Sequence, residues 1–212
     1  MTESKPKLVY FDIKGRGEPI RLAFAVGGIP FDDERISGAD FAKAKGEGAY
    51  PFGQLPVLMV EGKTISQSQA LLRYAGKKAG LYPKDDDLKA LLIDEIVGAV
   101  EDVIAATVPS LKEADEEKKM AMRKELAETT YPKWFGLLSK KMEENGSGPY
   151  FVGDSLTIAD LQAYSTFTWL SSGVLDGVPP TILDAFPRLQ AGIKAVGSHE
   201  KIKAWNESHQ KK

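Results

Sequence analysis

Two side chains near the amino terminus have the chemistry to stabilise a small anion. Tyr10 ends a run of alternating strand-forming residues, and Arg16 follows six positions later in a glycine-rich stretch. Pro19 favours the first turn of a helix, so the guanidinium of Arg16 is expected at the mouth of a helix. A neutral phenol donates a hydrogen bond, and a guanidinium supplies a permanent positive charge. The pair therefore predicts a site for an anion.

Two later motifs fit the same chemistry. A helix predicted to begin at Ser68 leaves its first backbone N–H groups without internal partners, and such a helix end binds carboxylates. Gln67 stands directly before it, and the tripeptide 54–56 precedes a predicted strand. In a βαβ-ββα unit these segments would reach one cleft. Simple capping of the helix by Ser66 or Ser68 is a structural alternative and is compatible with ligand binding.

Alternating strands and helices in the first eighty residues would position these motifs. Alternation of apolar residues predicts strands at Leu8–Asp12, Glu34–Ile36, Val57–Val60 and Lys63–Ser66, with helices at Glu18–Gly27 and Ser68–Lys78. A polar loop is expected between the second and third strands, and a Glu61-Gly62 turn between the last two. Gly80 is expected to end the second helix.

The remainder of the chain has a helical pattern. After a polar joint near residues 83–88, apolar residues three to four apart predict the core stripe of one long helix: Leu88, Leu92, Ile96, Ala99 and Val103. A second long helix is expected at Glu116–Glu144, followed by helical segments at Ser165–Leu170, Leu189–Val196 and Ile202–Trp205. Thr157 and Asp160 predict a capping box, which we interpret as purely structural.

Composition excludes several classes of protein. Apolar residues make up 42% and charged residues 27% of the 212 residues, as in ordinary globular proteins. A net charge of −2 argues against a nucleic-acid partner. No apolar run is long enough to span a bilayer or resembles a signal peptide, so a cytoplasmic location and no membrane partner are expected. The absence of cysteine excludes disulfides, thiolate metal sites and a cysteine nucleophile, and with only two histidines no metal site is expected.

Together the motifs resemble those of the cytosolic glutathione S-transferases that use a tyrosine, and the chain looks closest to the sigma-like class. The resemblance covers almost the whole chain. It implies a thioredoxin-like α/β domain over residues 1–82 that binds glutathione, a linker over 83–88, and an all-helical domain over 89–212 with the electrophile pocket. The implied activity is conjugation of glutathione, a co-substrate, to hydrophobic electrophiles, with no permanently bound cofactor.

The resemblance assigns catalysis to Tyr10 and Arg16. A free thiol has a pKa of about 8.5, so little thiolate exists at neutral pH. Hydrogen bonds donated to the sulfur favour the anion and lower that pKa. Tyr10 would therefore donate to the thiolate, and Arg16 would add positive potential beside the helix end. A half-buried strand tyrosine without a catalytic role is the alternative.

The resemblance also implies the residues that bind glutathione: Tyr10, Phe41, Lys45, Gln54, Leu55, Pro56, Gln67, Ser68 and Asp102. The Leu55–Pro56 bond is expected to be cis, with the Leu55 backbone facing the cysteinyl part of glutathione. Gln67 and Ser68 would hold the γ-glutamyl carboxylate, and Lys45 the glycyl carboxylate. Phe41 stands where related classes usually carry tryptophan, so it keeps an apolar wall and lacks the indole N–H.

Asp102 resembles the aspartate that reaches the glutathione amino group of the adjacent subunit, which implies a homodimer. A solvated Glu101–Asp102 pair is the alternative, and the insertion of Phe52 into a partner subunit is left open. The implied pocket for the electrophile is formed by Phe11, Ile13, Ile104 and Thr107.

Other activities remain open at this point. Vertebrate prostaglandin D synthase belongs to the sigma-like class, but Pro109 and Gln162 stand in two places where that isomerase has aromatic pocket residues. A glutathione-dependent isomerase or peroxidase is one alternative. A non-catalytic ligand-binding or crystallin-like relative is another.

Overall fold

The computed structural model describes residues 5–209, which form two compact units. Unit 1 combines Met1–Lys84 with Glu200–Lys212, and unit 2 spans Asp85–His199. The division after Lys84 falls inside the expected linker. The last helix belongs to unit 1, which differs from the expected division, because its side chains Lys201 and Trp205 bond to the first helix of that unit.

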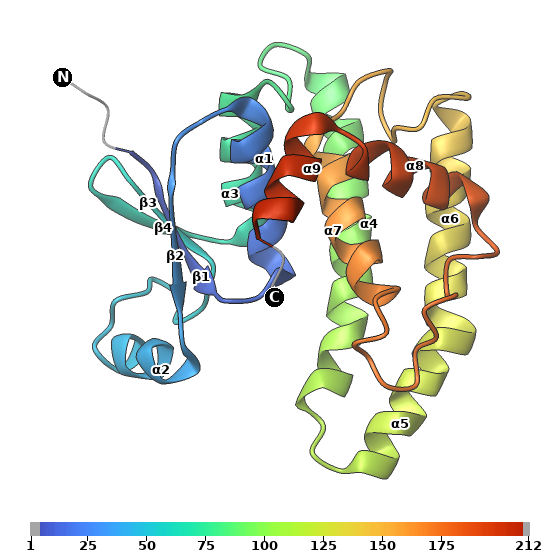
Figure 1. Ribbon diagram of the computed structural model, residues 1–212, viewed down its shortest axis with the longest axis horizontal. Coiled ribbons are helices and arrows are strands. Elements are labelled where there is room, and N and C mark those ends of the chain that lie inside the picture. Colours follow the sequence, from blue (N-terminus) through green and yellow to red (C-terminus); the bar gives the residue numbers. More distant parts are fainter. Residues whose placement is uncertain (1–4, 210–212) are drawn as a thin grey trace. The chain divides into compact units, whose positions relative to one another are not determined.

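Unit 1 is built on a four-stranded sheet with the strand order β2-β1-β3-β4 (Figure 1). The strands are β1 (Lys7–Phe11), β2 (Asp32–Ile36), β3 (Val57–Val60) and β4 (Lys63–Ser66), in agreement with the prediction to within two residues. β1 and β2 are parallel, while the β1–β3 and β3–β4 pairs are antiparallel. The parallel pair requires a crossover, and helix α1 provides it.

Two helices cover one side of this sheet. Figure 1 shows α1 (Glu18–Gly27) and α3 (Ser68–Ala79) together on that side. α9 (Glu200–Ser208) packs against α1. α3 ends as predicted at Gly80, which has a φ of 74° in the left-handed region, and α1 ends in the same way at Gly28, with a φ of 63°.

One helix of unit 1 was not predicted. α2 (Gly38–Gly46) lies where the sequence suggested a polar loop. Ser37 caps it by accepting a hydrogen bond from the Asp40 N–H at 3.1 Å. The apolar signal is weak because α2 has no fully buried residue, and only a few of its side chains pack against the cluster of Val9, Tyr50 and Val57.

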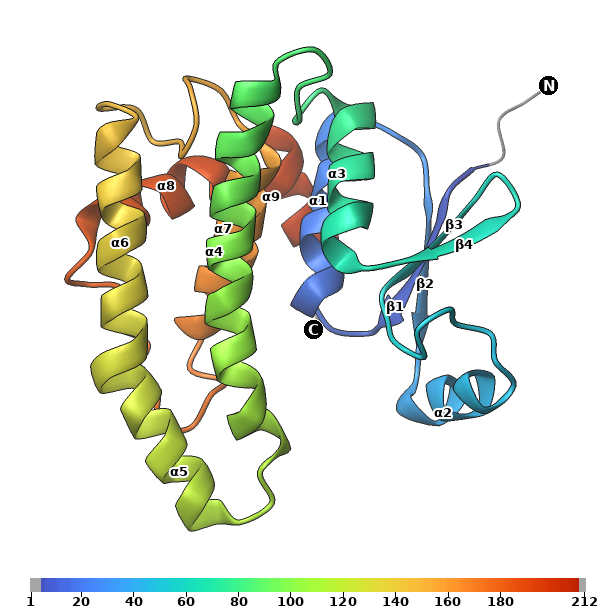
Figure 2. The ribbon, with the colours of Figure 1, turned by 180° about the vertical axis from the view of Figure 1, so that it is seen from behind.

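Unit 2 is helical, as predicted (Figure 2). Its helices are α4 (Asp87–Lys112), α5 (Glu116–Glu125), α6 (Tyr131–Glu144), α7 (Ile158–Leu170) and α8 (Pro187–Gly197), with a π-helical turn, η2 (Leu126–Thr130), between α5 and α6. The predicted capping box at the start of α7 is confirmed. Within residues 5–209, no helix has both the length and the apolar character needed to cross a membrane.

The predicted core stripe of α4 was partly wrong. Ile96 and Val103 are buried, but Leu88 and Leu92 are exposed. The buried face instead contains Ile93, Val97 and Val100. Because apolar residues occupy two faces of α4, spacing alone does not tell which face packs inside this unit.

Candidate active site

Tyr10 is held in place at the end of β1. Only the first three residues of β1 pair with β3, so Tyr10 lies beyond that ladder while still pairing with Arg35 of β2. Its side chain is 7% exposed. The Arg16 backbone N–H donates a hydrogen bond to the phenol oxygen over 3.2 Å. A phenol oxygen that accepts in this way still carries its own proton and can donate it elsewhere.

Two glycines pack directly against the Tyr10 ring. Gly15 and Gly17 bound the short 3₁₀ turn η1 (Gly15–Gly17). A Cβ atom at Gly15 would lie 2.7 Å from the Tyr10 hydroxyl, and one at Gly17 would lie 2.6 Å from Tyr10 Cδ1. Gly15 also has a φ of 41°, which favours glycine. The glycine-rich stretch therefore wraps the phenol ring, and Arg16 contributes its backbone as well as its charge.

Sequence reasoning missed one charged residue behind Tyr10. Arg21 of α1 is fully buried, and its Cζ lies 5.7 Å from the centroid of the Tyr10 ring. It pairs with Glu18 and with Asp33 of β2. An arginine between Ile20 and Leu22 on the buried side of α1 is a signal that could have identified it, because arginine is rarely buried unless it is paired.

The amino-terminal end of α3 offers backbone N–H donors to a carboxylate. Ser68 is its first residue, and the side chain of the preceding Gln67 makes no capping bond to the helix within the described residues. Gln67 has a φ of 77°, which is unusual for a residue other than glycine and typical of functional sites. The Ser66 hydroxyl beside it is buried and has no hydrogen-bond partner among residues 5–209.

A second group of predicted site residues gathers around α2. Phe41 and Lys45 lie one helical turn apart, and the Lys45 Nζ is 5.7 Å from the centroid of the Phe41 ring. The Phe11 ring meets the Phe41 ring edge-on at a centroid distance of 5.3 Å. Leu55 packs against the same core cluster, and the predicted cis bond between Leu55 and Pro56 is confirmed. Gln54, just before this bond, is exposed.

The predicted residues of the electrophile pocket come from both units. In unit 1, Phe11 is half-buried and Ile13 is 56% exposed. In unit 2, Ile104 is half-buried and Asp102 is exposed on α4.

Thr107 does not fit the expected pocket role. Its side chain is fully buried within unit 2. Its hydroxyl is bonded to the Val103 carbonyl and to the Tyr131 hydroxyl, each at 2.8 Å. Because neither its surface nor its hydroxyl is available, Thr107 is removed from the pocket. Gln162 is also buried, on helix α7.

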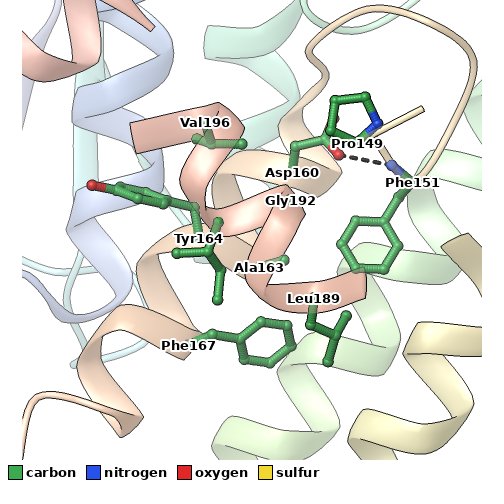
Figure 3. A pocket seen from close by; sticks show the side chains of 10 residues that line it. Pro149, Phe151, Asp160, Ala163, Tyr164, Phe167, Leu189, Gly192 and Val196 are labelled. Atoms are coloured by element: carbon green, nitrogen blue, oxygen red, sulfur yellow. Dashed lines mark hydrogen bonds between the residues drawn. The ribbon is translucent and has the colours of Figure 1, made fainter. Parts of the chain in front are cut away.

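The carboxyl group of Asp160 is buried in the first turn of α7 (Figure 3). It accepts hydrogen bonds from the backbone N–H groups of Phe151 and Thr157 and from the Thr157 hydroxyl, each at 2.8 Å. Burial nevertheless raises the pKa of Asp160 from 3.8 to about 6. A cavity of about 10 Å³ lies beside it, enough for about one water molecule and no larger ligand. We therefore assign Asp160 to the stability of unit 2.

Comparison with known proteins relates both units to one family. Residues 101–209 match the family model of the glutathione S-transferase carboxyl-terminal domain. Glutathione S-transferase 1 of Ascaris suum is 34% identical over 206 residues, covering 94% of each chain.

Solved structures extend this likeness to the fold. Prostaglandin synthase D of Nilaparvata lugens superimposes with a TM-score of 0.87 at 31% identity, covering 98% of this chain and all of the other. A monomeric glutathione S-transferase of the hookworm Necator americanus gives a TM-score of 0.81 at 34% identity, with 98% of each chain covered.

Proposed function

The chain belongs to the glutathione S-transferase family and is a glutathione S-transferase, and from this premise we propose that Tyr10 stabilises the thiolate of bound glutathione. The observation that carries the proposal is the fixed position of the Tyr10 phenol. Its ring is enclosed by Gly15 and Gly17, and its oxygen accepts the Arg16 N–H. A group that is already in place requires little reorganisation when charge develops on the sulfur.

The chemistry follows from the donor character of the phenol. A hydrogen bond from the Tyr10 hydroxyl to the sulfur favours the thiolate, and the released proton passes to solvent. The thiolate then attacks an electrophilic carbon, forms a carbon–sulfur bond and displaces a leaving group with its electron pair. Ile13 is exposed in the segment that follows Tyr10 and provides apolar surface for a hydrophobic electrophile.

We assign the two carboxylates of glutathione to opposite ends of the unit 1 site. The γ-glutamyl carboxylate is expected at the start of α3, at Gln67 and Ser68, because the first backbone N–H groups of a helix have no partners within that helix. The glycyl carboxylate is expected at Lys45, whose ammonium lies over Phe41. The backbone of Leu55 and Pro56 lies between these regions in sequence and is assigned to the cysteinyl part.

We further propose that the protein acts as a homodimer of the sigma-like class in the cytoplasm. Leu88, Leu91 and Leu92 form one exposed apolar face on α4, and Phe52 is 66% exposed. Exposed apolar groups that lie next to one another favour an interface between subunits. In such a dimer the exposed Asp102 of one subunit is expected to pair with the glutathione amino group bound to the other.

A second candidate function is a glutathione-dependent isomerase. It is favoured by the likeness of the chain to the prostaglandin synthase D of Nilaparvata lugens. Both reactions need the same thiolate, but isomerisation releases glutathione again while conjugation consumes it. Measuring the loss of free glutathione per product formed therefore separates the two functions.

The substitution Tyr10→Phe tests the proposed mechanism. It removes one hydrogen bond to a charged group, worth about 1.5–3 kcal/mol, so the pKa of the bound thiol should rise by roughly one to two units. The affinity for glutathione should change little, because the carboxylate contacts remain. Titration of thiolate absorbance in the bound complex measures the shift, and an unchanged titration curve would remove Tyr10 from the mechanism.

A further inference from the structure

We propose that Arg21 is a positioning residue that holds the segment between Tyr10 and α1 in the geometry required for thiolate stabilisation. The inference rests on the proposed function of Tyr10 and deepens it. Arg21 need not contact either substrate for this role. The proposal concerns the alignment of the phenol, which the Arg21 side chain controls through backbone carbonyl groups.

The Arg21 guanidinium bonds to the segment that carries the catalytic geometry. Its Nη1 donates to the Ile13 carbonyl at 2.7 Å and to the Lys14 carbonyl at 3.5 Å. Its Nη2 donates to the Phe11 carbonyl at 3.3 Å. These three carbonyls lie between Tyr10 and the Arg16 N–H that donates to the phenol oxygen. One side chain therefore fixes the connection between the two partners of that hydrogen bond.

Two carboxylates hold the guanidinium in turn. Asp33 of β2 accepts from the Arg21 Nε at 2.9 Å, and Glu18 accepts from Nη1 at 3.3 Å. Glu18 is 4% exposed, and its other oxygen accepts the Trp205 Nε1–H at 3.0 Å. The C-terminal helix α9 thus contributes to the placement of Arg21. Lys201 of the same helix also donates to the Val26 carbonyl of α1 at 2.7 Å.

The geometry of Arg21 matters more than its charge. Its single positive charge lies between the carboxylates of Glu18 and Asp33, which neutralise its field at the Tyr10 hydroxyl. The planar guanidinium, however, presents five N–H donors in a fixed arrangement. A lysine ammonium would keep the charge, but it could not reach two carboxylates and three carbonyls at once. The substitution Arg21→Lys therefore separates position from charge.

The test compares Arg21→Lys with Arg123→Lys as a matched control. Arg123 in unit 2 is 7% exposed and donates to the Asp176 carbonyl at 3.2 Å. Both variants replace a buried arginine by lysine. We expect Arg21→Lys to raise the pKa of the bound glutathione thiol by roughly half to one unit, which lowers the thiolate fraction about threefold to tenfold at pH values well below that pKa. Arg123→Lys should leave that pKa unchanged, and glutathione affinity should change less than about twofold in both.

The double variant Tyr10→Phe/Arg21→Lys identifies the route of the effect. If Arg21 acts through the phenol, adding Arg21→Lys to Tyr10→Phe should cause no further shift of the thiol pKa. An additional shift would mean that Arg21 acts on the sulfur directly, and the positioning role would be overturned. A shift with Tyr10→Phe but none with Arg21→Lys would also overturn this inference and leave the proposed function intact. No shift with Tyr10→Phe would overturn the proposed function itself.

A gentler substitution decides the matter if Arg21→Lys does not fold. Trp205→Phe removes the indole N–H from Glu18 and retains an aromatic ring against Phe31, which now lies 5.8 Å from Trp205 between centroids. Circular dichroism checks the fold of each variant. Trp205→Phe should raise the thiol pKa in the same direction as Arg21→Lys, by a smaller amount. A folded Trp205→Phe variant with an unchanged pKa would then refute the positioning role.

Discussion

An alanine at position 17 should disturb catalysis, although alanine can adopt the backbone conformation found there. Gly17 has φ and ψ of −79° and −28°, which any residue adopts. Its added Cβ, however, would lie 2.6 Å from Tyr10 Cδ1 and 3.0 Å from Tyr10 Cγ. Ordinary carbon contacts are about 3.5–4.0 Å, so the ring or the turn must move by about 1 Å. The substitution therefore moves the phenol without removing it.

The size of the effect follows from this displacement. Overpacking of this kind costs about 1–3 kcal/mol of stability. A misplacement of about 1 Å at a reacting group can reduce the rate by as much as about 100-fold. Loss of the aligned hydrogen bond to the thiolate alone accounts for roughly tenfold or more, at about 1.5–3 kcal/mol. We therefore expect kcat/KM with a model electrophile to fall about tenfold to 100-fold in Gly17→Ala.

The matched control is Gly136→Ala in α6, where the nearest atom to an added Cβ is Phe186 Cε1 at 4.0 Å. This variant should keep full activity and gain up to about 1 kcal/mol of stability, because alanine favours the helix. The assay measures thiolate absorbance of bound glutathione, kcat/KM and thermal unfolding in both variants. If Gly17→Ala matched Gly136→Ala in thiol pKa and kcat/KM, the packing argument for Tyr10 would be refuted.

Two further predictions concern stability and assembly. Because the folded state raises the pKa of Asp160 from 3.8 to about 6, its contribution to stability is complete below pH 3.8 and is lost as the pH rises towards 6. The loss amounts to roughly 3 kcal/mol for about two pKa units. Urea unfolding of the wild type and of Asp160→Asn between pH 3.5 and 7, in steps of about half a unit, measures this loss. If the free energy of unfolding changed equally with pH in both proteins, the prediction would be wrong. Leu91 is 64% exposed on α4 and would be buried in the proposed dimer, so Leu91→Glu should weaken that dimer by about 100-fold or more. The same substitution should also weaken glutathione binding, because the site would lose the partner's Asp102. Light scattering after size-exclusion chromatography measures the weakening of the dimer. A wild-type protein that is monomeric at all concentrations would exclude the dimer.

Local patterns in the sequence were sufficient for much of unit 1. The alternation in β1, β3 and β4 and the glycines after α1 and α3 act within a few residues, so their structure is encoded nearby. The capping box of α7 is local for the same reason. Helix α2 was missed because its stability depends on contacts of Phe41 with Phe11 and Tyr50, residues from other segments.

The two faces of α4 illustrate a different limit. Leu88, Leu91 and Leu92 are as apolar as the buried Ile93 and Val97, so hydrophobicity alone assigns both faces to a core. The structure shows that the leucines are not part of the core of this chain. Thr107 shows the same limit for a polar residue, because its burial depends on Tyr131, which is 24 residues away in the sequence.

The alignment of Tyr10 depends both on a local sequence motif and on contacts between residues that are far apart in the sequence. The tyrosine, the glycines and Arg16 lie within seven residues of one another and can be recognised as a motif. The groups that hold this motif do not: Asp33 is 12 residues from Arg21, and Trp205 is 187 residues from Glu18. A buried arginine costs free energy unless all such partners are present, so the fold must bring them together before the motif is correctly placed. The catalytic residue can thus be identified from a short segment, while its geometry depends on both ends of the chain.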